Sequence, residues 1–301
     1  MIFSLRRGLI SAIQLLILSA TLFFFFRLAP GDVFSVELAN PQRSAADIEA
    51  VREARGLTQS WARRYWNWLE SAAKGDLGVS LAYGIPVTTL IAPRMRNTAE
   101  VALLALGSAW LLGLGGALLA NRTRFVPLVL EPGAAAATMV PDVAAVSLIL
   151  WLAVWMGFSI SGAWLPIAGL TFAIAPTVFL HASSELGHAR RLDFVRIAQS
   201  RGISGARLWL RYTMPAAANP LISLAGLSVA AAIGSSFVVE VLTGFPGLGP
   251  LFLEAVQARD YPIVQAVLVL LAAVLILSNL AADLVLYRLD PRIRIPHDRH
   301  A

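Results

Sequence analysis

The chain has 301 residues, of which 57% are hydrophobic and only 14% are charged. Soluble domains carry about 25% charged residues, so the composition excludes a water-soluble globule, and an apolar content this high also excludes collagen, a coiled coil and a disordered chain. No cysteine is present, which excludes disulfides, thiolate metal sites and cysteine nucleophiles. The net charge of +6 fits either nucleic-acid binding or a membrane protein with basic loops on one side.

Stretches without charge divide the chain into membrane spans. A bilayer core of about 30 Å needs about 20 apolar helical residues, and Arg7 to Arg27 encloses 19 uncharged residues. The stretch from Glu131 to Glu185 is long enough for two helices, with a turn expected at 157–162. We therefore predict an all-α integral membrane protein with six transmembrane helices, over residues 8–28, 101–121, 134–157, 163–183, 217–239 and 262–286.

Basic residues indicate the orientation of these spans. The first span lacks a small-residue cleavage site, so we expect an uncleaved helix rather than a signal peptide. With a cytosolic N-terminus, the inside segments hold 14 of the 24 basic residues, and the two later outside loops hold only Arg259. The segment 30–97 holds eight of the others, and Arg27 lies at the end of the first span, but long loops are translocated largely regardless of charge. We predict that both termini are cytosolic and that the charge does not indicate nucleic-acid binding.

Two extramembrane segments carry distinctive residues. Residues 61–69 cluster aromatic side chains within the long outside loop, either as an interfacial belt or small local core, or as a site that stacks a sugar or peptide. The inside loop 184–215 predicts a helix from Asp193 to Arg201, which Gly202 ends. Ser204 can cap a second short helix, and a boundary at Pro215 precedes the next span.

This helical hairpin has two interpretations. Val195 and Ala198 share one face of the first helix, with Arg191, Arg196 and Arg201 around it. Such a hairpin can dock another protein, because small residues let it approach and arginines pair with acids. It can equally lie on the anionic inner leaflet, where each basic residue is worth about 1 kcal/mol.

No catalytic constellation is present. The single lysine, Lys74, lies outside any Gly-rich loop, so a Walker A sequence is impossible and the chain cannot be a P-loop ATPase by itself. Neither H-E-x-x-H nor G-x-S-x-G occurs. We therefore predict no enzyme activity, no catalytic residue and no metal site. The alternative to a transporter subunit is a self-contained secondary transporter or channel, which needs broken helices and paired intramembrane charges.

Asp142 is an acid within the third predicted span, and ionisable residues inside membranes are functional candidates. It either lines a watery translocation path or forms hydrogen bonds where Pro141 breaks the helix.

Several short motifs, in order along the chain, resemble the permease subunits of peptide- and nickel-type ABC importers, and in particular dipeptide permease B subunits. The inside loop, Asp193-Phe194-Val195-Arg196-Ile197-Ala198-Gln199-Ser200-Arg201-Gly202-Ile203-Ser204, is similar to their D-Y-V-R-T-A-R-A-K-G-L-S stretch. Tyr212-Thr213-Met214-Pro215 follows at the expected spacing. The other similar segments are 28–32, 75–80, 245–249, 258–262 and 289–294. Val140-Pro141-Asp142 departs from the family's I-P-x-F pattern.

The resemblance implies a type I ABC importer transmembrane fold in the cell (inner) membrane. Its segments would be 1–93, a helix with a long outside loop; 94–290, the transmembrane core; and 291–301, a cytosolic tail. It implies as partners a second permease subunit, two ABC ATPase subunits that hold ATP and Mg, and an extracytoplasmic substrate-binding protein, with no cofactor on this chain. The implied ATPase-coupling residues are Asp193, Val195, Arg196, Ala198, Arg201, Gly202, Arg207 and Pro215. The sequence does not distinguish among dipeptide, oligopeptide, nickel chelate, glutathione and opine as cargo.

Overall fold

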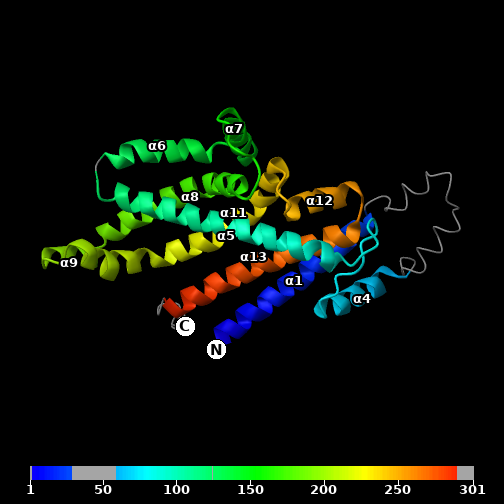
Figure 1. Cartoon of the computed structure of the whole chain (residues 1–301). Coiled ribbons are helices and arrows are strands. Elements are labelled where there is room, and N and C mark those ends of the chain that lie inside the picture. Colours follow the sequence, from blue (N-terminus) through cyan, green and yellow to red (C-terminus); the bar gives the residue numbers. More distant parts are fainter. Residues whose placement is uncertain (1, 29–58, 124, 290–301) are drawn as a thin grey trace. The chain divides into compact units, whose positions relative to one another are not determined.

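The computed structural model describes residues 2–28, 59–123 and 125–289, which are almost wholly helical (Figure 1). Within these residues the only extended pairing is an isolated antiparallel bridge between Val79 and Pro86. The family-like residues 29–32 and the predicted tail 291–301 lie outside the described residues. The helices are α1 (Ile2–Leu28), α4 (Trp61–Ala73), α5 (Val87–Ala120), α6 (Val126–Thr138), α7 (Asp142–Trp155), α8 (Trp164–Arg191), α9 (Asp193–Ser200), α10 (Gly205–Leu208), the π-helical η1 (Trp209–Thr213), α11 (Met214–Thr243), α12 (Leu248–Gln257) and α13 (Tyr261–Leu289).

Within the described residues, five helical runs are long and apolar enough to cross a bilayer, which confirms the predicted all-α membrane fold. They are α1, α5, α8, the continuous run Gly205–Thr243, and α13. A sixth span exists only if α6 and α7, which meet at 109°, are counted as one broken span.

The third predicted span, 134–157, is therefore wrong as a single helix. Pro141 lacks an N–H donor, and its ring disfavours helical geometry at the preceding residue. The chain leaves the helix after Thr138 and re-enters it at Asp142. The expected turn at 157–162 is confirmed, since Gly157 and Gly162 there adopt φ values of +77° and +96°, which favour glycine.

The chain divides into two compact units, residues 1–98 with 246–276 and residues 99–245 with 277–301. In the second unit α8 is central, because α6, α7 and α11 all pack against it. A Cβ added at Gly113 of α5 would lie 2.7 Å from Val178 Cγ1, and one added at Gly169 of α8 would lie 2.9 Å from Val146 Cγ2. Small residues thus allow the close helix contacts on which packing in lipid depends.

In the first unit, α4 packs on α1 through an aromatic cluster. The Tyr65 hydroxyl lies 2.9 Å from Ser19 Oγ, and the Tyr65 ring meets Phe23 edge-on at 5.4 Å. This contact favours the small local core among the interpretations of residues 61–69. The same unit joins two family-like segments that are far apart in sequence, through a hydrogen bond between Ser80 and Asp260.

Candidate functional site

The predicted hairpin forms where the sequence placed it. α9 begins at Asp193, whose negative charge in the first turn complements the helix dipole. It ends because Gly202 adopts φ +83°, while the Ile203 N–H donates to Ala198 O. Gly205, with φ +63°, then begins α10. Two glycine turns thus fold α9 and α10 into a compact pair at one end of α8.

The hairpin has its own small core. Val195, Ala198 and Leu208 are buried together, with Leu192, Ile203 and Tyr212 packed around them. Val195 and Ala198 therefore face α10 and η1 rather than solvent. Their placement shows that they hold the hairpin together, and a direct contact with a partner would have to come from other residues.

The exposed face of α9 carries large apolar side chains. Phe194 and Ile197, three residues apart and so on one face, are 49% and 51% exposed. The predicted contact residues Arg196, Arg201 and Arg207 are also exposed. Sequence reasoning missed Phe194 and Ile197 because they lie on the same broad apolar face of α9 as the buried Val195 and Ala198. Their spacing of three is the signal that could have found them.

An arginine anchors the hairpin to the helices behind it. Arg190, in the last turn of α8, donates a hydrogen bond to the main-chain oxygen of Asn121, directly after α5. Its guanidinium lies 5.6 Å from the centre of the Trp209 ring on η1. The Asn121 amide in turn donates to Ala117 O at 3.0 Å and to Ser183 O at 3.1 Å. The three elements that converge on the hairpin are thus joined by one polar cluster, which the sequence alone did not reveal.

The hairpin continues directly into a membrane helix. α10, η1 and α11 form one uninterrupted run from Gly205 to Thr243, so the predicted boundary at Pro215 is not a break. The proline lies in the first turn of α11, where its missing N–H is tolerated after the π-helical turn. Ser204 occupies the N-cap position of α10, as predicted, but its side chain forms no capping hydrogen bond.

Asp142 lies at the break between α6 and α7, at the first position of α7. Its Oδ2 accepts a hydrogen bond from the Ser235 hydroxyl of α11, and the side chain is half-buried. The carboxylate thus bonds across helices at the proline break, as one interpretation expects. Sequence reasoning missed a second acid, Glu240, because it lies just beyond the predicted span 217–239, whereas α11 continues past it and buries it completely.

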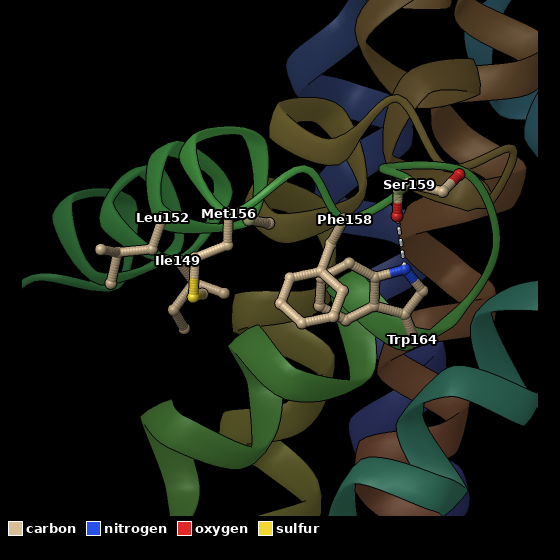
Figure 2. A pocket seen from close by; sticks show the side chains of 7 residues that line it. Ile149, Leu152, Met156, Phe158, Ser159 and Trp164 are labelled. Atoms are coloured by element: carbon tan, nitrogen blue, oxygen red, sulfur yellow. Dashed lines mark hydrogen bonds between the residues drawn. The ribbon is translucent and has the colours of Figure 1, made fainter.

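An apolar pocket of about 540 Å³ lies between α7 and the α7–α8 turn. Figure 2 shows Ile149, Leu152 and Met156 facing the rings of Phe158 and Trp164 across it. The Trp164 Nε1–H donates to the main-chain oxygen of Ser159 at 2.8 Å, which fixes the indole at the turn. No charged side chain lines the pocket, so it offers no group for chemistry. Likewise, the described part of the chain contains no group of three or more His, Asp or Glu side chains that could hold a metal ion.

Comparison with known proteins identifies the family. Residues 111–295 match the family described as "Binding-protein-dependent transport system inner membrane component", and residues 1–99 match the corresponding N-terminal family. The chain is 30% identical to the glutathione transport system permease protein GsiC of Escherichia coli, over 93% of this chain and 94% of that protein. It is also 30% identical to the probable peptide ABC transporter permease protein y4tP of Sinorhizobium fredii, over 97% of this chain and 99% of that protein.

The fold has a counterpart among solved structures. An inward-facing structure of the MetNI methionine ABC transporter aligns with a TM-score of 0.56 and 18% identity, over 67% of this chain and 97% of that chain. The match supports the helical architecture, while the family rests on the sequence comparisons. The chain therefore belongs to the family of inner-membrane components of binding-protein-dependent transport systems, and it is a multi-pass permease subunit of an ABC importer and not itself an enzyme.

Proposed function

We propose that the exposed face of α9 is the surface by which this permease couples to a separate ATPase subunit on the cytosolic side. The observation that carries this proposal is the position of Phe194 and Ile197, which are exposed beside arginines on a hairpin that has its own core. Exposed apolar side chains rimmed by charge are typical of protein interfaces. The chain has no Walker A sequence of its own, so the ATP and Mg would be held by the partner.

The predicted coupling residues then divide into two roles. Asp193, Val195, Ala198 and Gly202 shape the hairpin, through the helix start, the small core and the terminal turn. Pro215 follows the π-helical turn that joins the hairpin to α11. The residues that would meet the acidic groups of the ATPase share an exposed cationic head: Arg196, Arg201 and Arg207.

The anchor behind the hairpin supplies a route for motion. When two ATPase subunits close on ATP, the hairpin would be displaced. Arg190 and Trp209 would pass this displacement to the end of α5 and to α8 and α11. These helices would then tilt to open the path toward the other side. A second permease subunit would form the other half of this path.

The cargo we propose is a small peptide or a similar solute. Two relatives that cover nearly the whole chain are described as glutathione and peptide permeases. Asp142 is a candidate path residue, because only part of its carboxylate is occupied by Ser235 and the side chain is half-exposed. An acid there could attract the ammonium group of a peptide.

Reconstitution tests the proposed coupling. Purified permease pair and ATPase subunits should form a stable complex that imports solute into liposomes only with ATP and the binding protein. Ile197→Asp should weaken ATPase binding, because it places a charge in the apolar contact, whereas Thr123→Asp, an exposed position on the α5–α6 turn, should not. Uptake by this chain alone in an ion gradient would contradict the proposal. Mass spectrometry of the ligand retained by the binding protein would identify the cargo.

A further inference from the structure

Helix α4 is an amphipathic helix that is too short to cross a bilayer. Its 13 residues rise about 20 Å, whereas the apolar core of a bilayer is about 30 Å thick and needs about 20 residues. Tyr65, Trp68 and Leu69 form its partly buried side, and Arg63 and Asn67 are exposed. A helix of this kind, with basic and aromatic residues and two distinct sides, is typical of segments that lie along a membrane surface.

The partly buried side of α4 packs on the section of α1 that lies inside the bilayer. The Tyr65 hydroxyl lies 2.9 Å from Ser19 Oγ, and the Tyr65 ring contacts Phe23. The guanidinium of Arg64 lies 6.0 Å from the centre of the same phenylalanine ring. Ser19 and Phe23 both belong to the apolar stretch Leu5–Phe25, which is the membrane-spanning part of α1. The helix α4 therefore contacts a transmembrane segment and not only other loop residues.

These contacts fix the depth of α4 in the membrane. The span of α1 ends at Phe25, so a rise of 1.5 Å per residue places Phe23 about 3 Å and Ser19 about 9 Å below that end. With the N-terminus in the cytosol, this end of the span lies in the outer leaflet. The axis of α4 consequently lies where the acyl chains meet the headgroups, and α4 does not stand clear of the membrane.

The side of α4 that faces away from Tyr65 carries a cation and a large aromatic ring. Trp66 is 67% exposed, and Arg63 and Asn67, four residues apart, are exposed on the same face. Glu70 lies one turn further along, but Lys74 Nζ is 2.6 Å from its carboxylate and offsets its charge. The guanidinium of Arg63 therefore gives this face a net positive charge.

This face fits a phospholipid headgroup better than it fits another helix. A guanidinium is planar and binds phosphate oxygens through two parallel hydrogen bonds. Tryptophan is enriched at the level of the headgroups, where one end of its ring is in an apolar environment and the other is wet. Helices that meet within a membrane instead use small residues, as Gly113 and Gly169 of this chain do. Arginine, tryptophan and asparagine on one face do not allow such a close approach.

We propose that α4 binds the phosphate of anionic phospholipids in the outer leaflet, with Arg63 contacting the phosphate and Trp66 lying beside the headgroup. Tyr65 is a positioning residue, because it holds α4 at this depth through Ser19 and does not touch the lipid. The inference is independent of the proposed coupling to an ATPase, since it requires only that the chain is a membrane component.

Photo-cross-linking at position 66 tests the proposal in the assembled importer. The importer is reconstituted in nanodiscs with equal amounts of phosphatidylglycerol and phosphatidylcholine, and a photo-reactive phenylalanine derivative replaces Trp66. Mass spectrometry then gives the ratio of the two lipid adducts at this position. Phosphatidylglycerol should exceed phosphatidylcholine about fivefold, which is the preference that corresponds to about 1 kcal/mol for one basic residue at an anionic membrane surface.

The role of Arg63 makes a distinct prediction. Arg63→Gln should bring the ratio of adducts close to one, whereas Arg63→Lys should retain a preference for phosphatidylglycerol because it retains a cation. Arg96→Gln is the matched control, because Arg96 is an exposed arginine of α5 outside α4, and it should leave the ratio unchanged.

Three results would overturn the inference. The first is an equal yield of both lipid adducts with Arg63 in place, and the second is a preference that Arg63→Gln leaves unchanged. The third is an adduct with the second permease or with the binding protein in place of lipid. ATP hydrolysis by each variant checks that the importer has assembled.

Discussion

Replacement of Arg190 tests whether the anchor transmits motion from the hairpin. This side chain donates to the carbonyl of Asn121, beyond the end of α5, and lies over the ring of Trp209. Carbonyls at the end of a helix carry the negative pole of its dipole, so a cation there is favoured. Arg190→Ala removes both contacts and leaves the hairpin held to α5, α8 and α11 by the chain and by the apolar packing of Trp209.

The free energy that Arg190 contributes to holding the hairpin can be worked out from these two contacts. A hydrogen bond from a charged donor contributes about 1.5–3 kcal/mol, and we take the lower end because Arg190 is only half-buried. A cation–π contact at a partly exposed site adds about 0.5–1 kcal/mol. Together they amount to about 2 kcal/mol, which corresponds to a roughly 30-fold change in the ratio of anchored to detached hairpins.

The assay compares ATP hydrolysis with solute uptake in the reconstituted importer. Arg190→Ala should retain ATP hydrolysis but lower the number of solute molecules imported per ATP, since a more weakly anchored hairpin passes less of its movement to α5. Arg191→Ala is the matched control, because Arg191 is the next residue and is exposed. An unchanged ratio in Arg190→Ala, or an equal fall in Arg191→Ala, would refute the reasoning.

Three further predictions concern other parts of the molecule. Gly113→Ala places a Cβ 2.7 Å from Val178, so we expect the free energy of unfolding to fall by about 1–3 kcal/mol and the thermal unfolding midpoint to fall with it. The control Gly107→Ala, where nothing lies within 4 Å of the added Cβ, should leave the midpoint unchanged. Gly202→Ala requires a residue with a Cβ to adopt φ +83°, which strains the hairpin by about 1–2 kcal/mol. It should therefore weaken co-purification of the ATPase more than the control Ser200→Ala does. Asp142→Asn should lower uptake more than assembly; normal uptake at normal expression would remove Asp142 from the path.

Local signals in the sequence account for what could be predicted. The hairpin was predictable because Asp193, Gly202 and the apolar spacing of α9 act within a few residues. The spans were predictable because lipid demands long charge-free stretches. One interpretation of Asp142 included a break at Pro141, but the span 134–157 was still predicted as a single helix, because the spacing of charges does not register a proline.

Long-range contacts account for what could not be predicted. The apolar residues of α9 share one broad face, so only the packing of Leu208 decides that Val195 is inside and Ile197 outside. Asp260 precedes the predicted span 262–286, and nothing in its local sequence shows that the chain buries it against Ser80. Pairings of this kind depend on how distant segments meet, which a single sequence does not state.

The central claim is that the exposed face of α9 lies in the cytosol and binds the ATPase. Because the chain has no cysteine, Ile197→Cys introduces a single reactive thiol on this face. A membrane-impermeant maleimide should label it in inside-out vesicles but not in intact cells, and added ATPase subunits should protect it. Labelling from outside, or labelling that the ATPase leaves unchanged, would contradict the account.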